Sequence, residues 1–298
     1  MATYGTIYTY WSQDWDGNDI VAIAKKVAKA GLTGMEMHAS ELDGWSKQKQ
    51  LDYKKLTDDL GLTVVYCTGV NESEGLSYYS DDPKVREASI EQMKRNLEWC
   101  AMMGASGNVI NTSLHSAWPA KPPAPVADKE PYFEKIADCL KSITKTAQDL
   151  DVRIATEISN RFEGFIITTV AEMRHIMDLV GSEYLGITFD NFHMNIEEDS
   201  IEESVRMAGD KIFHVHLGEA NRKLPGQGKM IDWNLFFGEL KKTGYDRMLM
   251  VEPFVIHTGT VAYSTFLWRD LTGGADEEEM TRQLQESIAF IKGKYEGR

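Results

Sequence analysis

Short apolar runs alternate along the chain with longer amphipathic stretches. The short runs are rich in β-branched and aromatic residues and have the length of strands, whereas the longer stretches repeat their apolar positions with a helical period. This alternation is typical of parallel strands joined by crossover helices. The pattern predicts strands at Thr6–Tyr10, Gly34–His38, Thr63–Cys67, Gly107–Asn111, Val152–Glu157, Leu185–Asp190, Ile212–Leu217 and Met248–Glu252.

The amphipathic stretches predict the helices between these strands. They lie at Ile20–Ala30, Lys84–Met103, Tyr132–Leu150, Val170–Leu179, Ile201–Ala208 and Trp233–Thr243, with a closing helix at Glu277–Tyr295. Glycines that suit a left-handed helix end precede several strands, at Gly31, Gly61, Gly104 and Gly244. Repeated βα units without a linker predict an α/β fold, a single (β/α)8 TIM-barrel domain over residues 1–298.

One segment interrupts this pattern. Trp118–Pro131 holds five of the eight prolines and follows the fourth predicted strand. Because proline disrupts helix interiors, we expect a loop here. The loop is either a rigid surface connection or a lid over the carboxyl face of the barrel, where the loops that follow strands lie.

Composition and charge narrow the class of function. Apolar residues make up 42% and charged residues 26%, as in ordinary globular proteins, and no run is long and apolar enough to span a membrane. The amino terminus lacks a basic secretory leader, and the three cysteines are scattered, so a cytoplasmic protein with reduced thiols is expected. The net charge of −14 repels polyanions. Nucleic acid is therefore not an expected partner, and a neutral small molecule is.

Ionisable residues fall at the ends of the last four predicted strands. These residues are Glu157, Asp190, His216 and Glu252. The carboxyl ends of barrel strands converge, and carboxylates so close together would repel one another unless a cation lay between them. Three carboxylates and one imidazole suit Mn²⁺, Mg²⁺ or Co²⁺ better than a thiolate-seeking ion. His214 points to the same side of its strand as His216, and we interpret it as a packed or supporting residue rather than a ligand.

Polar motifs follow three of these strands, at Asn160–Glu163, Phe192–Asn195 and Gly218–Arg222. Such groups can bind a polyhydroxylated substrate, and the side chains of His193 and Arg222 are donors suited to an enediolate. For Arg161 and Glu163 a surface ion pair is an equally open interpretation. The aromatic side chains of Trp15, Trp118 and Phe254 can pack on the carbon face of a sugar, or simply pack near the rim. Gly226–Gly228 resembles a turn and is weak support for phosphate binding.

These motifs resemble a known family, the D-tagatose 3-epimerase and D-psicose (D-allulose) 3-epimerase group of xylose isomerase-like barrels. The resemblance covers essentially the whole chain. It is most specific at N-R-F-E (Asn160–Glu163), F-H-M-N-I-E-E-D-S (Phe192–Ser200), H-x-G-E-x-N-R-x-x-P-G-x-G (His216–Gly228) and E-P-F (Glu252–Phe254). The family's metal ligands fall on the four strand-end residues. Its substrate contacts fall on Glu163, His193 and Arg222, with Trp15, Trp118 and Phe254 along the far end of the sugar.

The resemblance also implies Mn²⁺ or Co²⁺ as cofactor and a homodimer or homotetramer. The sequence departs from the family at several positions near the predicted site, including Ile7, His38, Ser159 and Asn191, and the loop at Ser73–Asp82 also differs. The preferred ketose therefore stays open.

The predicted reaction is inversion of C3 of a free keto-sugar through a cis-enediolate. Glu157 and Glu252 are predicted to be the catalytic proton-transfer pair, because they end strands separated by two others. An aldose–ketose isomerase on the same barrel is the first alternative. A metal-dependent phosphodiesterase is disfavoured by the negative charge and the shortage of histidine ligands, and a sugar-binding protein without catalysis is disfavoured by the paired glutamates.

Overall fold

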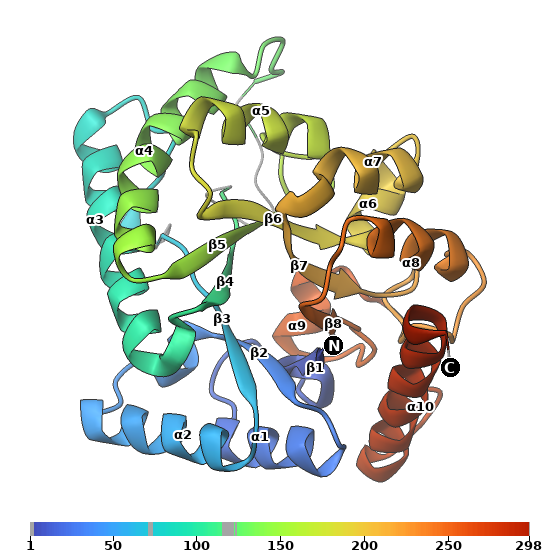
Figure 1. Cartoon of the computed structure of the whole chain (residues 1–298). Coiled ribbons are helices and arrows are strands. Elements are labelled where there is room, and N and C mark those ends of the chain that lie inside the picture. The colour runs from blue at the N-terminus through green and yellow to red at the C-terminus, as the bar shows by residue number, and fades with distance from the viewer. Residues whose placement is uncertain (1–2, 71–73, 115–121, 123, 298) are drawn as a thin grey trace.

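The structure of the protein is a computed structural model, and it describes residues 3–70, 74–114, 122 and 124–297. Eight parallel strands form a closed barrel in chain order, and the first strand pairs with the last (Figure 1). The strands are β1 (Thr3–Ile7), β2 (Gly34–His38), β3 (Thr63–Cys67), β4 (Asn108–Thr112), β5 (Val152–Glu157), β6 (Leu185–Asp190), β7 (Ile212–Leu217) and β8 (Met248–Val251). The predicted α/β barrel is thus confirmed.

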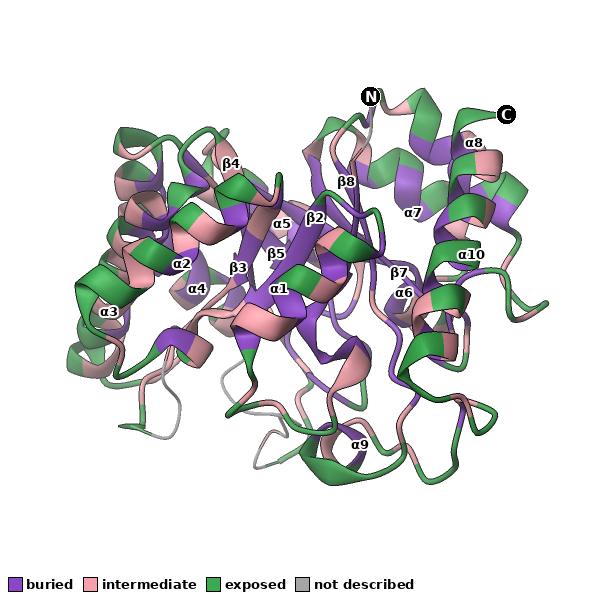
Figure 2. Ribbon diagram, turned by 90° about the horizontal axis from the view of Figure 1, so that it is seen from below, coloured by how far each residue is buried: buried purple, intermediate pink, exposed green. Residues whose placement is uncertain are grey.

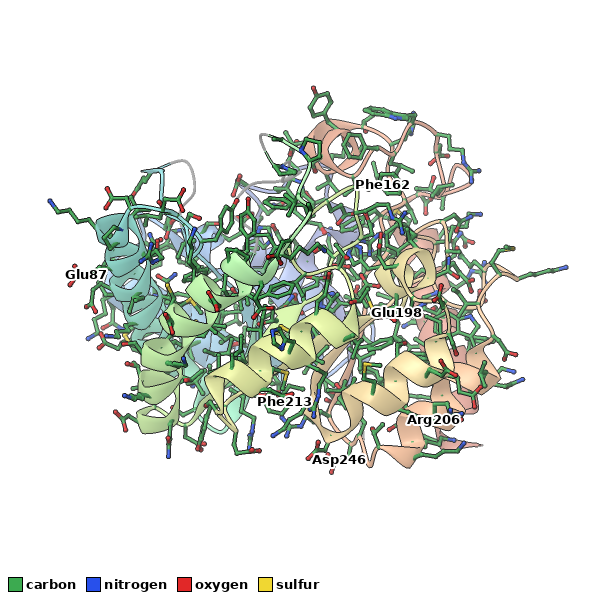
Figure 3. All side chains as sticks on the ribbon, turned by 90° about the horizontal axis from the view of Figure 1, so that it is seen from above. Glu87, Phe162, Glu198, Arg206, Phe213 and Asp246 are labelled. Atoms are coloured by element: carbon green, nitrogen blue, oxygen red, sulfur yellow. The ribbon has the colours of Figure 1, made fainter. Side chains whose placement is uncertain are left out.

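Helices surround the strands. They are α1 (Ile20–Lys29), α2 (Lys47–Asp59), α3 (Pro83–Cys100), α4 (Glu130–Asp149), α5 (Val170–Val180), α6 (Asn191–Glu197), α7 (Ile201–Ala208), α8 (Trp233–Lys242), α9 (Gly259–Ser264) and α10 (Glu277–Glu296). Buried residues fill the strands and the inward helix faces (Figure 2), while exposed side chains such as Glu87 on α3 and Arg206 on α7 lie at the periphery (Figure 3). In the described part of the chain, no helix has the length and apolarity that a membrane crossing requires.

Local chemistry explains where the helices begin and end. Side chains cap the amino-terminal N–H groups of most of them, and at α5 Thr169 and Glu172 form a reciprocal capping box. The predicted helix ends at Gly31, Gly61 and Gly244 all have positive φ, as a left-handed terminus requires. Gly104, with φ 102°, lies within a π-helical turn at Ala101–Ala105 that extends α3.

Three strands differ from their predicted bounds: the first, the fourth and the last, which ends at Val251 rather than at Glu252. The first strand is β1 (Thr3–Ile7) rather than Thr6–Tyr10, and Tyr8–Trp11 forms a 3₁₀ helix. Burial of Tyr8 and Tyr10 continues past the strand, so the apolar pattern alone placed the strand too late. The fourth strand begins one residue later than predicted, at Asn108, because Gly107 has a positive φ of 75°.

Helix boundaries deviate where the apolar signal is weak. The helix α4 begins at Glu130, so the predicted loop ends earlier than Pro131, which lies in the first helical turn where its missing N–H is harmless. The mostly polar α2 and the short α6 and α9 were not predicted. The helix α6 is the most consequential of these, because it directly follows β6 and carries residues of the predicted site.

Strands β1 and β2 approach closely because their paired residues Gly5 and Gly34 have no side chains. A Cβ atom on Gly5 would lie 2.7 Å from the carbonyl carbon and oxygen of Gly34. This contact is with backbone, which cannot move aside as a flexible side chain can. The pair thus sets the spacing on the side of the barrel where β2 carries buried polar residues.

We predict that Gly5→Ala lowers the free energy of unfolding by roughly 1–3 kcal/mol, the usual range for overpacking. Gly238 in α8 is the control, because a Cβ there meets no atom within 4 Å. Gly238→Ala should raise stability by roughly 0.5–1 kcal/mol through helix propensity. Urea unfolding followed by circular dichroism measures both changes. An unchanged midpoint for Gly5→Ala would contradict this account of the strand spacing.

Candidate active site

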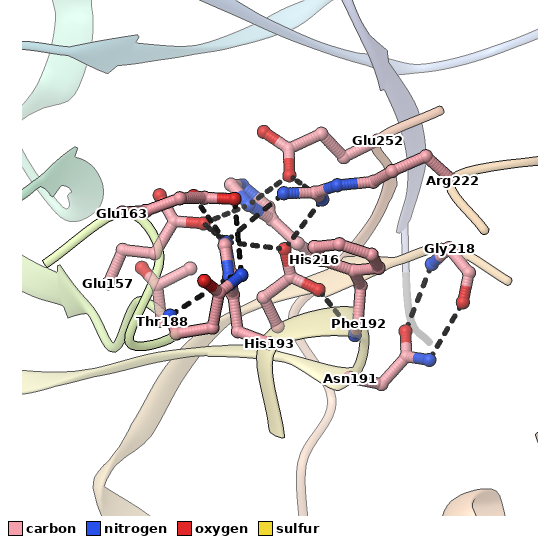
Figure 4. Close-up of polar contacts among 12 residues, drawn as sticks. Glu157, Glu163, Thr188, Asn191, Phe192, His193, His216, Gly218, Arg222 and Glu252 are labelled. Atoms are coloured by element: carbon pink, nitrogen blue, oxygen red, sulfur yellow. Dashed lines mark hydrogen bonds and ion pairs between the residues drawn. The ribbon is translucent and has the colours of Figure 1, made fainter. Parts of the chain in front are cut away.

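The carboxyl ends of β5 to β8 bring four ionisable side chains together (Figure 4). Glu157 and Asp190 end β5 and β6, His216 lies near the end of β7, and Glu252 directly follows β8. Asp190 and His216 are register partners on neighbouring strands. One ligand atom from each of the four residues lies within 4.8 Å of the others. The structure therefore places together the residues that the strand ends predicted.

The chemistry of this cluster fits a divalent cation. Asp190 and His216 are fully buried, and the side chains of Glu157 and Glu252 are 14% exposed. The Nδ1 atom of His216 lies 3.2 Å from Oε1 of Glu157 and 3.4 Å from Oε2 of Glu252. Three carboxylates so close in a buried site repel one another, and hard oxygen ligands with one imidazole are a set that such a cation binds.

Arg222 supplies a permanent positive charge beside the cluster. Its Nη1 donates to Oδ2 of Asp190 at 2.9 Å and to Oε2 of Glu252 at 2.8 Å. The guanidinium lies 3.8 Å from the ring centroid of Phe192 and 4.9 Å from that of Phe254. Burial alone would lower the pKa of Arg222, but the neighbouring carboxylates outweigh it and raise the pKa. The residue therefore stays charged and held in place.

Glu219 holds the loop that carries Arg222 in place. Arg222 has a positive φ of 64°, and its N–H donates to the carbonyl of Glu219 at 2.8 Å. Oε1 of Glu219 accepts from the N–H of Gly226 at 2.7 Å and from Nε1 of Trp233 at 3.0 Å. A Cβ on Gly228 would lie 2.4 Å from Oε2 of Glu219, so only glycine fits there. Gly226 has a φ of 90°, and a Cβ there would lie 2.9 Å from the ring of Phe290. Packing and backbone conformation thus account for both glycines of the turn without a phosphate.

Glu36 supports His216 from behind and was not predicted as a site residue. Its Oε2 lies 2.7 Å from Nε2 of His214 and 3.0 Å from Nε2 of His216. Burial would raise the pKa of Glu36, but the two histidines outweigh it and lower the pKa. A charged Glu36 accepts a hydrogen bond from the Nε2–H group of His216. The lone pair on Nδ1 of His216 therefore faces the carboxylate cluster. The sequence signal was a single glutamate within the otherwise apolar strand Gly34–His38.

Asn111 links this support to one of the proposed catalytic glutamates. The hydroxyl of Thr188 donates to Oδ1 of Asn111 at 2.8 Å, which fixes the orientation of the amide. The Nδ2 group then donates to Oε1 of Glu36 at 3.0 Å and to Oε2 of Glu157 at 3.4 Å. Asn111 was also missed, because an amide within a strand has no local feature that marks its partners.

The pKa values of Glu157 and Glu252 shift in opposite directions. Burial raises the pKa of Glu157. Burial acts on Glu252 in the same sense, but His216 and Arg222 outweigh it and lower the pKa. Two carboxylates whose environments separate their pKa values are suited to act as an acid and a base.

Most of the predicted substrate contacts line one cavity of about 340 Å³. Trp15, His193, Arg222 and Phe254 line it together with Glu157 and Glu252. The cavity is also lined by residues that the sequence did not mark as cavity residues, namely Tyr8, Cys67, Asn111 and Ser113. His38 lines it as well. Trp118 lies outside the described residues, as do residues 119–121 and 123 of the proline-rich segment.

Glu163 and Arg161 occupy different environments. Glu163 is buried beside the cavity rather than among the residues that line it, with Oε1 accepting from Nδ2 of Asn160 at 3.1 Å and Oε2 lying 3.4 Å from Nε2 of His193. Burial raises the pKa of Glu163 to about 8. Arg161 instead forms a surface ion pair with Glu197 through its Nε at 2.8 Å. The surface interpretation is thus confirmed for Arg161 and wrong for Glu163.

Comparison with known proteins agrees with this geometry. The sequence pattern described as xylose isomerase-like TIM barrel matches residues 24–292. A D-psicose 3-epimerase of Agrobacterium fabrum is 33% identical over 97% of this chain and 98% of its own, and an L-ribulose 3-epimerase of Methylomonas sp. is 29% identical over 98% and 97%. Crystal structures of D-psicose 3-epimerase with D-tagatose from Clostridium cellulolyticum H10 give a TM-score of 0.91 at 31% identity, covering 98% of this chain and 99% of the other. The chain therefore belongs to the xylose isomerase-like TIM barrels, and within them to the carbohydrate epimerases.

The support of His216 by Glu36 generates a prediction about ion affinity. Glu36→Gln removes the charge that orients His216, so the affinity for Mn²⁺ should fall roughly 10- to 100-fold. Titration calorimetry measures the affinity, and circular dichroism checks that the variant is folded.

The matched control is Glu239→Gln. Glu239 is also a buried glutamate, but it lies on α8 and forms ion pairs with Arg206 and Lys242 rather than with a residue of the strand-end cluster. Its variant should bind Mn²⁺ with unchanged affinity. Equal affinities for the Glu36 and Glu239 variants would show that Glu36 does not support the metal ligand.

Proposed function

We propose that this protein is a metal-dependent ketose 3-epimerase that inverts C3 of a free keto-sugar. The observation that carries the proposal is the placement of Glu157 and Glu252 on either side of His216, at the ends of strands separated by two others. Both carboxylates line the cavity, so both can reach one substrate. The membership in the carbohydrate epimerases supports the same reaction.

Inversion at C3 requires two proton-transfer groups. The C2 carbonyl acidifies the C3 proton, one carboxylate removes it, and the other returns a proton to the opposite face of the cis-enediolate. The raised pKa of Glu157 and the lowered pKa of Glu252 suit a pair of which one carries a proton and the other does not. The configuration of the substrate decides which of them acts first.

The four strand-end residues Glu157, Asp190, His216 and Glu252 would hold the divalent ion. That ion would supply Lewis acidity toward the substrate's C2 and C3 oxygens. We propose Mn²⁺ or Co²⁺, with Mg²⁺ compatible with the same oxygen ligands.

Two further donors face the developing negative charge. The N–H of Asn160 donates to Nδ1 of His193 at 3.1 Å, which holds the ring in place. Nε2 of His193 and the guanidinium of Arg222 lie 3.1 Å apart at the cavity. Positioned donors of this kind stabilise an enediolate more than they stabilise the ketose. His193 and Arg222 are therefore proposed to bind the reacting end of the sugar, with Glu163 holding His193.

The rest of the cavity suits the distal carbons of a ketose such as D-fructose, D-psicose, D-tagatose or D-sorbose. Trp15 and Phe254 form an aromatic wall, with ring centroids 5.5 Å apart. Such rings pack on the carbon face of a sugar. Trp118 is proposed to contribute to the same end of the substrate.

We also propose a homodimer or homotetramer. Among the described residues, four large aromatic side chains are at least half exposed, and one of them is Phe162, labelled in Figure 3. The others are Tyr263, Phe266 and Trp268, which contact one another. Contiguous exposed aromatic surface of this kind is typical of association sites.

Metal dependence is the first test of the proposed function. Removing divalent ions with a chelator should abolish epimerisation of D-fructose, and Mn²⁺ or Co²⁺ should restore it, because the carboxylates alone do not stabilise the enediolate charge. Polarimetry or chromatography of the product measures the rate. Full activity in rigorously metal-free protein would exclude this mechanism.

The position of proton exchange is the second test. In deuterated buffer the product should gain deuterium at C3, because the proton removed by one glutamate is replaced by another; NMR detects the label. Glu157→Gln and Glu252→Gln should each lower kcat by at least ~10²–10⁴-fold. Glu134→Gln, at an exposed glutamate on α4, should leave it unchanged. Deuterium at C1 with C3 retained would establish an aldose–ketose isomerase instead.

A further inference from the structure

His38 lines the cavity beside Trp15 and is not one of the groups assigned to proton transfer. It ends β2, two residues after Glu36, so both side chains leave the strand on the same side and His38 lies nearer the carboxyl end. Its ring stacks on Trp15, with centroids 5.3 Å apart and an interplanar angle of 16°. The imidazole is thus part of the aromatic end of the cavity.

The hydrogen bonds around Tyr8 fix the tautomer of His38. The hydroxyl of Tyr8 lies 2.6 Å from the carbonyl of Trp15, which can only accept, so the single phenolic proton is donated there. Nδ1 of His38 lies 3.1 Å from the same phenolic oxygen. That oxygen has no second proton to give, so the hydrogen bond requires a proton on Nδ1 of His38. Burial lowers the pKa of His38, so the ring is neutral and Nε2 carries a lone pair.

The Nε2 lone pair is available to a ligand. Among the residues that the structure describes, none donates to Nε2 of His38, and this atom is not one of the fully enclosed polar atoms without a partner. Its accessible surface therefore opens to the cavity that His38 lines. The neighbouring wall, formed by Ile7, Trp15 and Phe254, is apolar, so His38 is a polar acceptor set within it.

We propose that Nε2 of His38 accepts a hydrogen bond from a distal hydroxyl of the ketose, at C5 or C6, and thereby selects sugars that carry this hydroxyl. This inference rests on the proposed function for the identity of the substrate class. It follows from the position of the reacting groups. Glu157 and Glu252 hold C3, and the sugar's far carbons extend along Trp15 and Phe254 to the imidazole. His38 is in this view a specificity residue, because it contacts substrate without transferring a proton.

The test compares D-psicose with its 1-deoxy, 5-deoxy and 6-deoxy analogues in three proteins. For the wild-type enzyme, kcat/KM should fall about 3- to 10-fold when the bonded hydroxyl is removed, as expected for one neutral hydrogen bond. In His38→Leu this difference between D-psicose and the 5-deoxy or 6-deoxy sugar should disappear. His38→Gln, which restores an acceptor near the position of Nε2, should recover part of it. The effect of removing the C1 hydroxyl should be the same in all three proteins.

A purely structural role predicts a different outcome. If His38 only shapes the cavity, His38→Leu lowers kcat/KM for every sugar by one common factor and leaves the deoxy ratios unchanged, which would overturn the proposal. Absence of turnover on any ketose by the wild-type protein would instead contradict the proposed function.

Nitrogen NMR of ¹⁵N-histidine-labelled protein tests His38 independently of turnover. Assigned by comparison with His38→Gln, Nε2 of His38 should have the shift of an unprotonated nitrogen and should move upfield when D-fructose or D-psicose is added. A protonated Nε2 in the free protein, or a signal that saturating sugar leaves unmoved, would also overturn the proposal.

Discussion

The balance of charge among three buried carboxylates is the constraint on which the site depends. Closure of a parallel barrel brings Glu157, Asp190 and Glu252 to the same end of the molecule, where water is largely excluded. Their repulsion is strong at low dielectric, so opposite charge must be supplied from nearby. Arg222 supplies part of it, and the ligand geometry leaves a divalent ion to supply the rest. Burial raises the pKa of Glu157, whereas His216 and Arg222 lower the pKa of Glu252.

A second layer of residues holds this arrangement in place. Glu36 orients His216 from below, and Asn111 connects Glu36 with Glu157. Both lie on strands, which are rigid, so small displacements of Glu157 and His216 are resisted. Arg222 comes from a loop, and its loop is in turn fixed by the buried carboxylate of Glu219. The positions of the strand-end side chains are thus fixed by residues outside the four-residue cluster.

The cavity has two ends of different chemistry. The reacting end is charged and built from β5 to β8, whereas the other end is formed by aromatic rings with His38 among them. A change at the second end alters which sugar fits without disturbing the charge balance at the first. This separation allows a barrel to keep one reaction while its substrate preference varies.

The barrel and the strand-end cluster could both be predicted from the order of residues alone. Alternation of apolar and polar positions is a local property, so the bounds of β2, β3, β5, β6 and β7 could be predicted residue by residue. The end of each strand was then known, and parallel closure implies that such ends meet. Glu157, Asp190 and His216 were found in this way, and Glu252 with them, although it lies just outside β8.

The residues that support the cluster, and the hydrogen-bonding groups that face the cavity, could not be predicted in this way. They depend on contacts between distant segments of the folded chain. Glu36 and His216 are 180 positions apart, and the pattern around each gives no sign of the other. The burial of Glu163, the surface position of Arg161 and the role of Glu219 likewise depend on neighbours from distant segments. The tautomer of His38 is set by Tyr8 and the carbonyl of Trp15. The physical reason is that periodicity records which face of an element is buried, whereas hydrogen bonds and pKa values depend on the particular atoms that closure of the barrel brings within a few ångströms.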